Sequence, residues 1–232
     1  MSTTNDQKWC FAYPAKAQNV TGQDRAALVK ASKWNAGDTI SVSFLDGDPE
    51  VQKKVRDAAQ GWTKGTSMAN LTLDFRKNTT KTLVRISFQY SGSWSVIGTT
   101  CRQVTDLTQP TMNFGWLTPD SDDDEVQRVV LHEFGHALGL IHEHQNPAKG
   151  IKWNREAVIK DLSGPPNNWP LDVIEHNMFE PYKAKETNFT ATDADSIMMY
   201  PIPASWTLDG YTVGLNSKLS PTDKKFIHAQ YP

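Results

Sequence analysis

Four segments in the first half of the chain alternate apolar and polar residues. They are TISVSFLD (39–46), LTLDF (71–75), LVRISF (83–88) and TMNFGWL (111–117). A period of two is typical of strands with one buried face, because successive side chains point to opposite sides of a sheet. The pattern therefore predicts four strands between residues 39 and 117.

Three further segments have apolar residues at helical spacing, and we expect helices at about 49–64, 122–138 and 221–229. Each follows a residue whose side chain can cap a helix N-terminus, namely Asp48, Ser121 and Ser220. Two of these helices also begin with proline, which suits the first helical position. Ser121 with Asp124 resembles a capping box. Between residue 143 and the last helix we expect little regular structure.

Length, charge and hydropathy describe an ordinary globular chain. The 232 residues can form one sizeable core, which a cleft can divide into two lobes. A net charge of −2 gives no overall attraction to nucleic acid or to anionic membranes, and no apolar run is long enough to cross a bilayer. The polar start MSTTNDQKWC lacks the features of a secretion signal. Two cysteines, Cys10 and Cys101, are too few for a disulfide framework.

The segment HEFGHALGLIH, which begins at His132, is the most informative part of the sequence. His132 and His136 are four residues apart, so on a helix they lie on the same face and can share one metal ion. Gly139 permits a left-handed backbone conformation, and the chain can then reverse and bring His142 toward the same point. Glu133 flanks the ion without being needed as a ligand. Three neutral imidazoles and one open position form a catalytic zinc site, because a structural site closes with four protein ligands.

A histidine pair at helical spacing is more often an ordinary surface or core feature, and the short pattern H-E-x-x-H also occurs by chance. The longer pattern fixes a glycine and a third histidine as well, and four of the six histidines lie between residues 132 and 144. We therefore interpret the segment as a site for one catalytic zinc ion. The acidic run from Asp122 to Glu125 could bind calcium, but helix capping explains it without an ion.

The segment DADSIMMYP (193–201), taken alone, would be an apolar turn with Met198 and Met199 as core residues. Beside the histidine segment it resembles the methionine turn of the metzincin zinc peptidases, in the S-I-M-x-Y form of astacins and serralysins. This resemblance implies that Met198 lies beneath the three imidazoles. It also implies that Tyr200 can approach the zinc as an extra ligand and leave it when substrate binds. Glu143, directly after the third histidine, is the residue type that astacins carry there.

The resemblance implies an α+β fold in a single metallopeptidase catalytic domain that covers residues 1–232. It implies an N-terminal arm (1–38) and an upper lobe (about 39–140) with a mixed, twisted sheet and two long helices. An irregular lower lobe (about 141–232) would end in a helix. The segments SWSVIGTT and TMNFGWL also resemble stretches of bacterial and matrixin-like members.

The implied activity is that of a zinc-dependent endopeptidase that hydrolyses peptide bonds of protein substrates. Glu133 would activate a zinc-bound water and return its proton to the leaving amine, and Tyr200 could donate a hydrogen bond to the oxyanion. The substrate is expected to pair with an edge strand within residues 96–116. The mostly apolar residues after the methionine turn would accept an apolar or aromatic side chain, or would simply be core and loop: Pro201, Ile202, Pro203 and Trp206.

Several alternatives remain open. A Cys10 thiolate could fill the open zinc position and keep the enzyme latent, Cys10 could pair with Cys101, or it could be a buried free thiol. A zinc-binding protein without catalysis is a second function class, although it would have no need for Glu133. A zinc hydrolase for non-peptide amides is a third. We expect a secreted monomer whose partners are protein or peptide substrates, with no nucleic-acid and no membrane partner.

Overall fold

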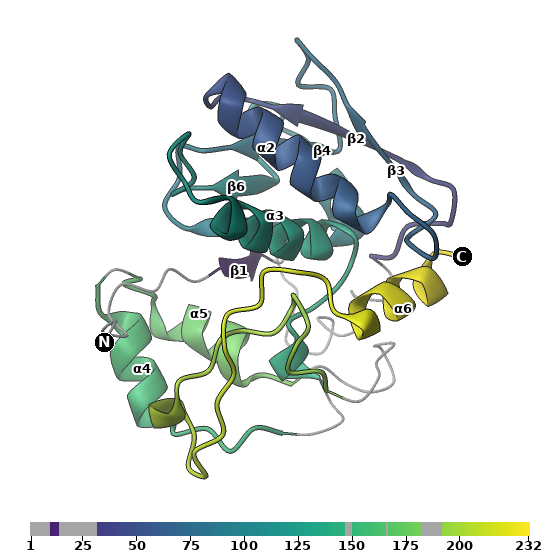
Figure 1. Ribbon diagram of the computed structural model, residues 1–232. Coiled ribbons are helices and arrows are strands. Elements are labelled where there is room, and N and C mark those ends of the chain that lie inside the picture. The colour runs from purple at the N-terminus through teal and green to yellow at the C-terminus, as the bar shows by residue number, and fades with distance from the viewer. Residues whose placement is uncertain (1–9, 14–31, 147–149, 166, 182–191) are drawn as a thin grey trace.

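The computed structural model describes residues 10–13, 32–146, 150–165, 167–181 and 192–232 (Figure 1). Most of the expected N-terminal arm therefore lies outside the described residues. A sheet with two helices on one face forms the upper part of Figure 1, and shorter helices and long connections form the lower part. This arrangement is the α+β fold that the sequence predicted.

One six-stranded sheet contains all the strands of the described residues. They are β1 (Cys10–Tyr13), β2 (Thr39–Phe44), β3 (Thr72–Phe75), β4 (Val84–Ser87), β5 (Ser93–Val96) and β6 (Met112–Phe114). Their order is β1-β5-β6-β4-β2-β3, and neighbours are parallel except for β5 and β6. The predicted mixed sheet is confirmed, but the sequence pattern missed β1 and β5.

The helices α2 (Pro49–Ala59) and α3 (Asp123–Ala137) lie side by side on one face of the sheet (Figure 1). Asp48 caps α2 by accepting a hydrogen bond from the backbone N–H of Glu50 at 2.7 Å. The cap of α3 is Asp122, one residue later than predicted. Asp122 Oδ1 accepts from the backbone N–H groups of Asp124 and Glu125, whereas Ser121 Oγ accepts from the N–H of Thr118.

The larger core lies between the sheet and these two helices. Its fully buried side chains include Ile40, Val55, Ile86, Met112 and Phe134. Burial of each large apolar side chain stabilises the fold by roughly 1.5–3 kcal/mol. Ile197 and Met198 belong to the same core, together with Ile227 of α6 (Pro221–Gln230) and Tyr231. The predicted methionine turn and the last helix therefore pack against the upper part of the molecule.

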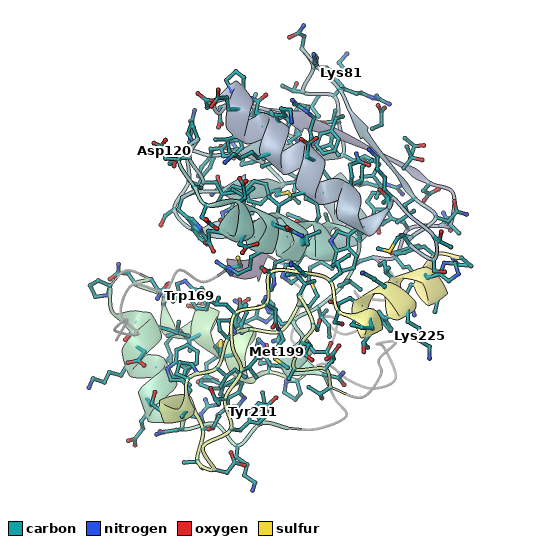
Figure 2. The ribbon with its side chains drawn as sticks, in the orientation of Figure 1. Lys81, Asp120, Trp169, Met199, Tyr211 and Lys225 are labelled. Atoms are coloured by element: carbon teal, nitrogen blue, oxygen red, sulfur yellow. The ribbon has the colours of Figure 1, made fainter. Side chains whose placement is uncertain are left out.

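A second core holds the lower part together, with Trp169 and Met199 among its residues (Figure 2). It contains α4 (Arg155–Ser163), α5 (Leu171–Ile174), a π-helical turn (Glu175–Phe179) and a 3₁₀ helix (Ala204–Trp206). The lower part is largely irregular before the last helix, as expected, but the sequence did not predict these elements. These elements are short, and contacts between segments far apart in the sequence stabilise them. One example is the 2.7 Å hydrogen bond from Trp206 Nε1 to Asp161 Oδ2. Among the described residues, no helix has the length and apolar character needed to cross a membrane.

Candidate metal centre

Helix α3 and the turn after it bring three imidazoles together. His132 and His136 lie one helical turn apart, with ring centroids separated by 4.9 Å. Gly139 has a φ of +96°, so it adopts the left-handed conformation that ends the helix and reverses the chain. His142 then returns to the site, where its Nε2 lies 3.1 Å from Nε2 of His136. All three rings are buried, and one nitrogen of each lies within 4.8 Å of the others.

A backbone or side-chain oxygen fixes the tautomer of each ring. Nδ1 of His132 donates to the carbonyl of Ile197 at 2.8 Å, and Nδ1 of His136 donates to that of Leu140 at 2.9 Å. Nδ1 of His142 lies 3.2 Å from the side-chain oxygen of Gln145. Since each Nδ1 carries the proton, each Nε2 presents a lone pair, as a metal ligand must.

The geometry and charge of these rings fit a zinc ion. Two lone pairs that face each other at 3.1 Å repel unless a cation lies beside them. Two zinc–nitrogen bonds of about 2.0–2.1 Å at a tetrahedral angle place their nitrogens about 3.3 Å apart. Burial lowers the pKa of His132 and His142 well below the ordinary value and that of His136 to about 4, so all three are neutral at pH 7. Neutral imidazole is the form that binds a metal.

Glu133 follows the first histidine and is completely buried. Neither of its carboxylate oxygens has a hydrogen-bond partner among the described residues, and the same is true of Nε2 of His132. Burial raises the pKa of Glu133 well above the ordinary value, while the thiol of Cys10 and the nearby Arg128 favour the charged form. A buried carboxylate beside three lone pairs is suited to bind water or to exchange protons.

The methionine turn lies directly against α3. A Cβ atom added to Gly135 would come within 2.3 Å of Met198 Sδ, so a larger residue at this helix position would displace the end of the Met198 side chain. The turn is also tied to both histidine segments, because Ile197 accepts from His132 and the carbonyl of Met198 accepts from the N–H of Glu143 at 2.9 Å. The sequence analysis missed Gly135, although a glycine inside a predicted helix is a signal of close packing.

Tyr200 lies beside the histidines, with its ring centroid 4.3 Å from that of His142 and 5.8 Å from that of His132. Its hydroxyl donates a hydrogen bond to the backbone carbonyl of Cys10 in β1. Burial raises the pKa of this hydroxyl well above its ordinary value, so Tyr200 is a neutral donor. The structure thus shows a tyrosine at the site that binds the carbonyl of an extended segment.

Comparison with known proteins agrees with this geometry. The sequence matches no protein-family model. It is 24% identical over 236 residues to zinc metalloproteinase nas-30 of Caenorhabditis elegans, covering 99% of this chain and 29% of nas-30. The chain therefore spans less than a third of that relative. A solved structure of myroilysin superposes with a TM-score of 0.82 and 41% identity over 88% of this chain and 97% of myroilysin. A second myroilysin crystal structure gives 0.70 and 38% over 100% and 93%.

The chain belongs to the metzincin zinc metallopeptidases. It is a hydrolase of the astacin-like type, and the predicted fold and enzyme class are confirmed.

Cys10 of β1 lies at the metal centre of this metzincin. Its Sγ, a nitrogen of His132 and a carboxylate oxygen of Glu133 lie within 4.8 Å of one another. The side chain is buried, and burial raises the pKa of the thiol well above the ordinary value. Cys10 and Cys101 are both free, so the alternative in which they form a disulfide is wrong for this structure.

A pocket opens beside the metal centre of the metzincin. Its lining residues are Cys10, Arg128, His132, Ile197, Met199, Tyr200, Pro201, Leu215 and Asn216. Of the four residues predicted to line it, only Pro201 does. Ile202 and Trp206 are instead buried in the second core, and Pro203 precedes a 3₁₀ helix. The chain is extended at Ile202, which forms a β-bridge with Val213, so successive side chains point in opposite directions. Ile202 therefore points away from the pocket and into the second core.

Arg128 is a pocket residue that the sequence analysis missed. It lies four residues before His132 and therefore on the same face of α3, and this spacing could have identified it. Its guanidinium makes two 2.8 Å hydrogen bonds to the carboxylate of Glu125. This bidentate pair balances the charge of Arg128 within the pocket.

Proposed function

We propose that the chain is an endopeptidase that uses one zinc ion held by His132, His136 and His142, with Glu133 as the general base. The observation that carries this proposal is the group of three buried Nε2 lone pairs beside a buried carboxylate whose oxygens have no partner among the described residues. When bound, the ion would polarise the substrate carbonyl and make a water molecule more acidic.

The side chains of the site supply the remaining chemistry. Glu133 takes the proton of the attacking water on a carboxylate oxygen and later gives it to the leaving amine. Its raised pKa suits this exchange, because the proton is then held without a large penalty. Tyr200 donates a hydrogen bond to the substrate oxygen that becomes negative. Its present bond to the carbonyl of Cys10 is a contact of the same chemical kind.

The substrate is proposed to lie along β5. This strand is the outer strand of the sheet once β1 is set aside, and β1 already pairs with it from Cys10↔Ser93 to Tyr13↔Val96. An extended peptide that adds to an exposed strand is held by main-chain hydrogen bonds. The edge strand was expected within residues 96–116, whereas our proposal puts it at β5 (Ser93–Val96), which overlaps that range only at Val96. The expected range instead contains β6, which is an interior strand.

The same contacts support a latent state of the enzyme. β1 occupies the edge where a substrate would bind, the hydroxyl of Tyr200 is bonded to it, and Cys10 lies against His132 and Glu133. We therefore infer that β1 excludes substrate and that Cys10 would bind the metal as a thiolate, its proton being released when the metal binds. Removal of β1 would then activate the enzyme.

We propose that the pocket, which now has room for about one water molecule, accepts an apolar or aromatic side chain after the cleaved bond once β1 and Cys10 have left it. Ile197, Met199, Pro201 and Leu215 give it apolar walls, and the charge of Arg128 is balanced by Glu125. Protein substrates, a monomeric state and an extracellular location complete the proposal. Size-exclusion chromatography and detection of the protein in culture medium check the last two.

The assignment of Glu133 is tested with the Glu133→Gln variant. It should bind zinc as the wild type does and cleave a quenched peptide about 10²–10⁴-fold more slowly, because only the base is lost. Glu156→Gln, on the exposed side of α4, is the matched control and should retain full activity. The assay is run in a Cys10→Ser background, with and without phenanthroline. A Glu133→Gln variant that cleaves at the wild-type rate would exclude Glu133 as the base.

The same assay separates the other function classes. A non-catalytic zinc protein would bind zinc and cleave nothing, and an amidase for small molecules would spare peptides and casein. Peptides that differ only after the cleaved bond test the pocket. Faster cleavage before Leu or Phe than before Asp supports the apolar pocket, and the reverse order would mean that Arg128 determines the preference.

A further inference from the structure

Asp223 is a buried carboxylate at the start of α6, far in sequence from the histidines. It is 7% exposed and accepts three hydrogen bonds. Its Oδ1 accepts from the hydroxyl of Ser196 at 2.6 Å, and its Oδ2 accepts from the N–H groups of Ile197 at 2.8 Å and Ser220 at 2.9 Å. Only the bond to Ser220 belongs to the cap of α6, so two of the three bonds go to the methionine turn.

One residue, Ile197, links Asp223 to the metal centre through its two backbone polar groups. The N–H of the residue Ile197 donates to Asp223, and the carbonyl of the same residue accepts the Nδ1 proton of His132 at 2.8 Å. The residue is thus held from both sides. Because a ring nitrogen bonded to a fixed carbonyl determines both the tautomer and the orientation of a histidine, the position of Ile197 decides where Nε2 of His132 points.

Ser196 makes a second link. Its hydroxyl donates to Asp223 and accepts a hydrogen bond from the N–H of Met198 at 3.1 Å. Met198 in turn lies against α3 at Gly135, one residue before His136. Asp223 therefore fixes the two consecutive residues of the turn that contact the histidine helix.

We propose that Asp223 is a positioning residue of the metal centre, which holds the methionine turn so that His132 presents Nε2 to the zinc ion. This inference rests on the proposed zinc site. The chemistry requires a carboxylate, because all three partners are donors. Asparagine has only one acceptor oxygen and would turn its NH₂ group toward a donor. A role limited to capping α6 would need only the bond to Ser220.

The matched pair of variants is Asp223→Asn and Ser220→Ala. Asp223→Asn disturbs the links to Ile197 and Ser196. Ser220→Ala removes the 2.9 Å bond from the N–H of Asp223 to Ser220 Oγ and the 2.7 Å bond from Ser220 Oγ to Asp193 Oδ2. It leaves the bonds of Asp223 to Ser196 and Ile197 in place. Loss of a cap is expected to lower the melting temperature by about 2–4 °C in either variant.

The deciding measurement is the zinc dissociation constant by competition with a chromogenic chelator, supported by the visible spectrum of the cobalt-substituted protein. Asp223→Asn should raise the dissociation constant about 10-fold or more and change the cobalt bands, since partners behind a ligand typically contribute 10–100-fold to affinity. Ser220→Ala should stay within about 3-fold of the wild type. Equal dissociation constants and spectra for Asp223→Asn and the wild type would overturn the proposal.

Two features keep the test decisive. If Asp223→Asn does not fold, Ser196→Ala removes the hydroxyl that joins Asp223 to Met198 and leaves the bond between Asp223 and Ile197 in place. This variant should weaken zinc binding several-fold, and an unchanged dissociation constant would overturn the inference. The readout also needs no catalysis. A protein that binds zinc and loses affinity on substitution of Asp223 supports the inference even if it cleaves no peptide, so failure of the proposed peptidase activity is recognised separately.

Discussion

Gly135 is the residue that lets the methionine turn reach the histidine helix. In a helix interior, glycine is ordinarily about 1 kcal/mol less favourable than alanine. Here the added Cβ would lie 2.3 Å from Met198 Sδ and 3.2 Å from Trp62 Cζ2, both in buried side chains. Overpacking of this kind costs about 1–3 kcal/mol. We therefore expect Gly135→Ala to lower the free energy of unfolding and to weaken zinc binding, as measured by urea unfolding and chelator competition.

A double-mutant cycle with Met198→Ala serves as the control for this prediction. Met198→Ala removes the atom that would clash, so Gly135→Ala should be less harmful in that background than in the wild type. A Gly135→Ala variant that is more stable than the wild type would show that α3 and the turn are not in close contact.

The residues of the site differ in how far the sequence predicts them. His132, His136 and His142 lie within eleven residues, so helical spacing and one glycine are sufficient to predict that the rings meet. Arg128 follows from the same spacing but was missed, because an arginine on a helix is usually solvated. Cys10 and Asp223 could not be placed, because long-range pairing of β1 and the packing of α6 bring them to the site.

At the scale of elements, the two ends of the chain complete the C-terminus of α3. Nε1 of Trp34 donates to the carbonyl of Ala137 at 2.9 Å, and the hydroxyl of Tyr231 donates to that of Leu138 at 2.6 Å. These carbonyls belong to the last turn of the helix, where no intrahelical donor follows. The histidine helix is thus held at its end by side chains nearly 200 residues apart in the sequence.

Tyr231→Phe tests this arrangement. Loss of the hydroxyl leaves a buried carbonyl without that donor and should reduce the free energy of unfolding by about 1–2 kcal/mol in urea titrations. Tyr211→Phe, on an exposed ring, is the control and should change the free energy of unfolding by less than about 0.5 kcal/mol.

Burial raises the pKa of Tyr231 to about 12. The contribution of this hydroxyl to stability is therefore complete below pH 10, near the pKa of an unfolded tyrosine, and is lost as pH rises through about 12. Equal stability of Tyr231→Phe and the wild type would contradict the role of this bond.

Elements with a strong local pattern were predicted, and elements stabilised by distant contacts were not. β2, β3, β4 and β6 alternate apolar and polar residues, and the structure places them within one or two residues of the expected starts. β5 has the sequence SWSV, and its serines are buried although they are polar. A pattern that expects apolar residues on the buried face therefore does not detect this strand. α4 has only two buried apolar side chains, Val158 and Leu162, which is too few for a pattern.

At the scale of the whole molecule, the metal centre joins the two cores. Helix α3 and Met198 belong to the larger core, while Met199 and Tyr200 belong to the smaller one. His142 lies on the connection between them. A division of the sequence near residue 141 therefore separates His142 from the two other histidines of the site. It also assigns α6 to the lower lobe, although Ile227 of α6 packs in the larger core. Periodicity alone does not reveal such a division, because it reports one element at a time.

β1 adds a third segment to this junction, and its removal should turn the enzyme on. Cys10→Ser keeps the size of the side chain but replaces a thiolate, which binds zinc well, with a hydroxyl that binds it poorly. We expect cleavage of a quenched peptide by the intact variant to rise about 10-fold or more over the wild type, with unchanged zinc content. Cys101→Ser is the matched control, since Cys101 is equally buried and free but lies in the 3₁₀ helix Gly98–Gln103 of the upper lobe.

Pairing of β1 with β5 should still restrain the Cys10→Ser variant, because the strand covers the edge on which substrate would lie. Limited proteolysis that removes residues through Tyr13 should therefore raise activity further and bring the wild type and the variant to the same rate. Equal rates after cleavage mean that Cys10 acts only while β1 is in place. An intact wild type that is already as active as the cleaved protein would show that neither the thiol nor the strand blocks the site.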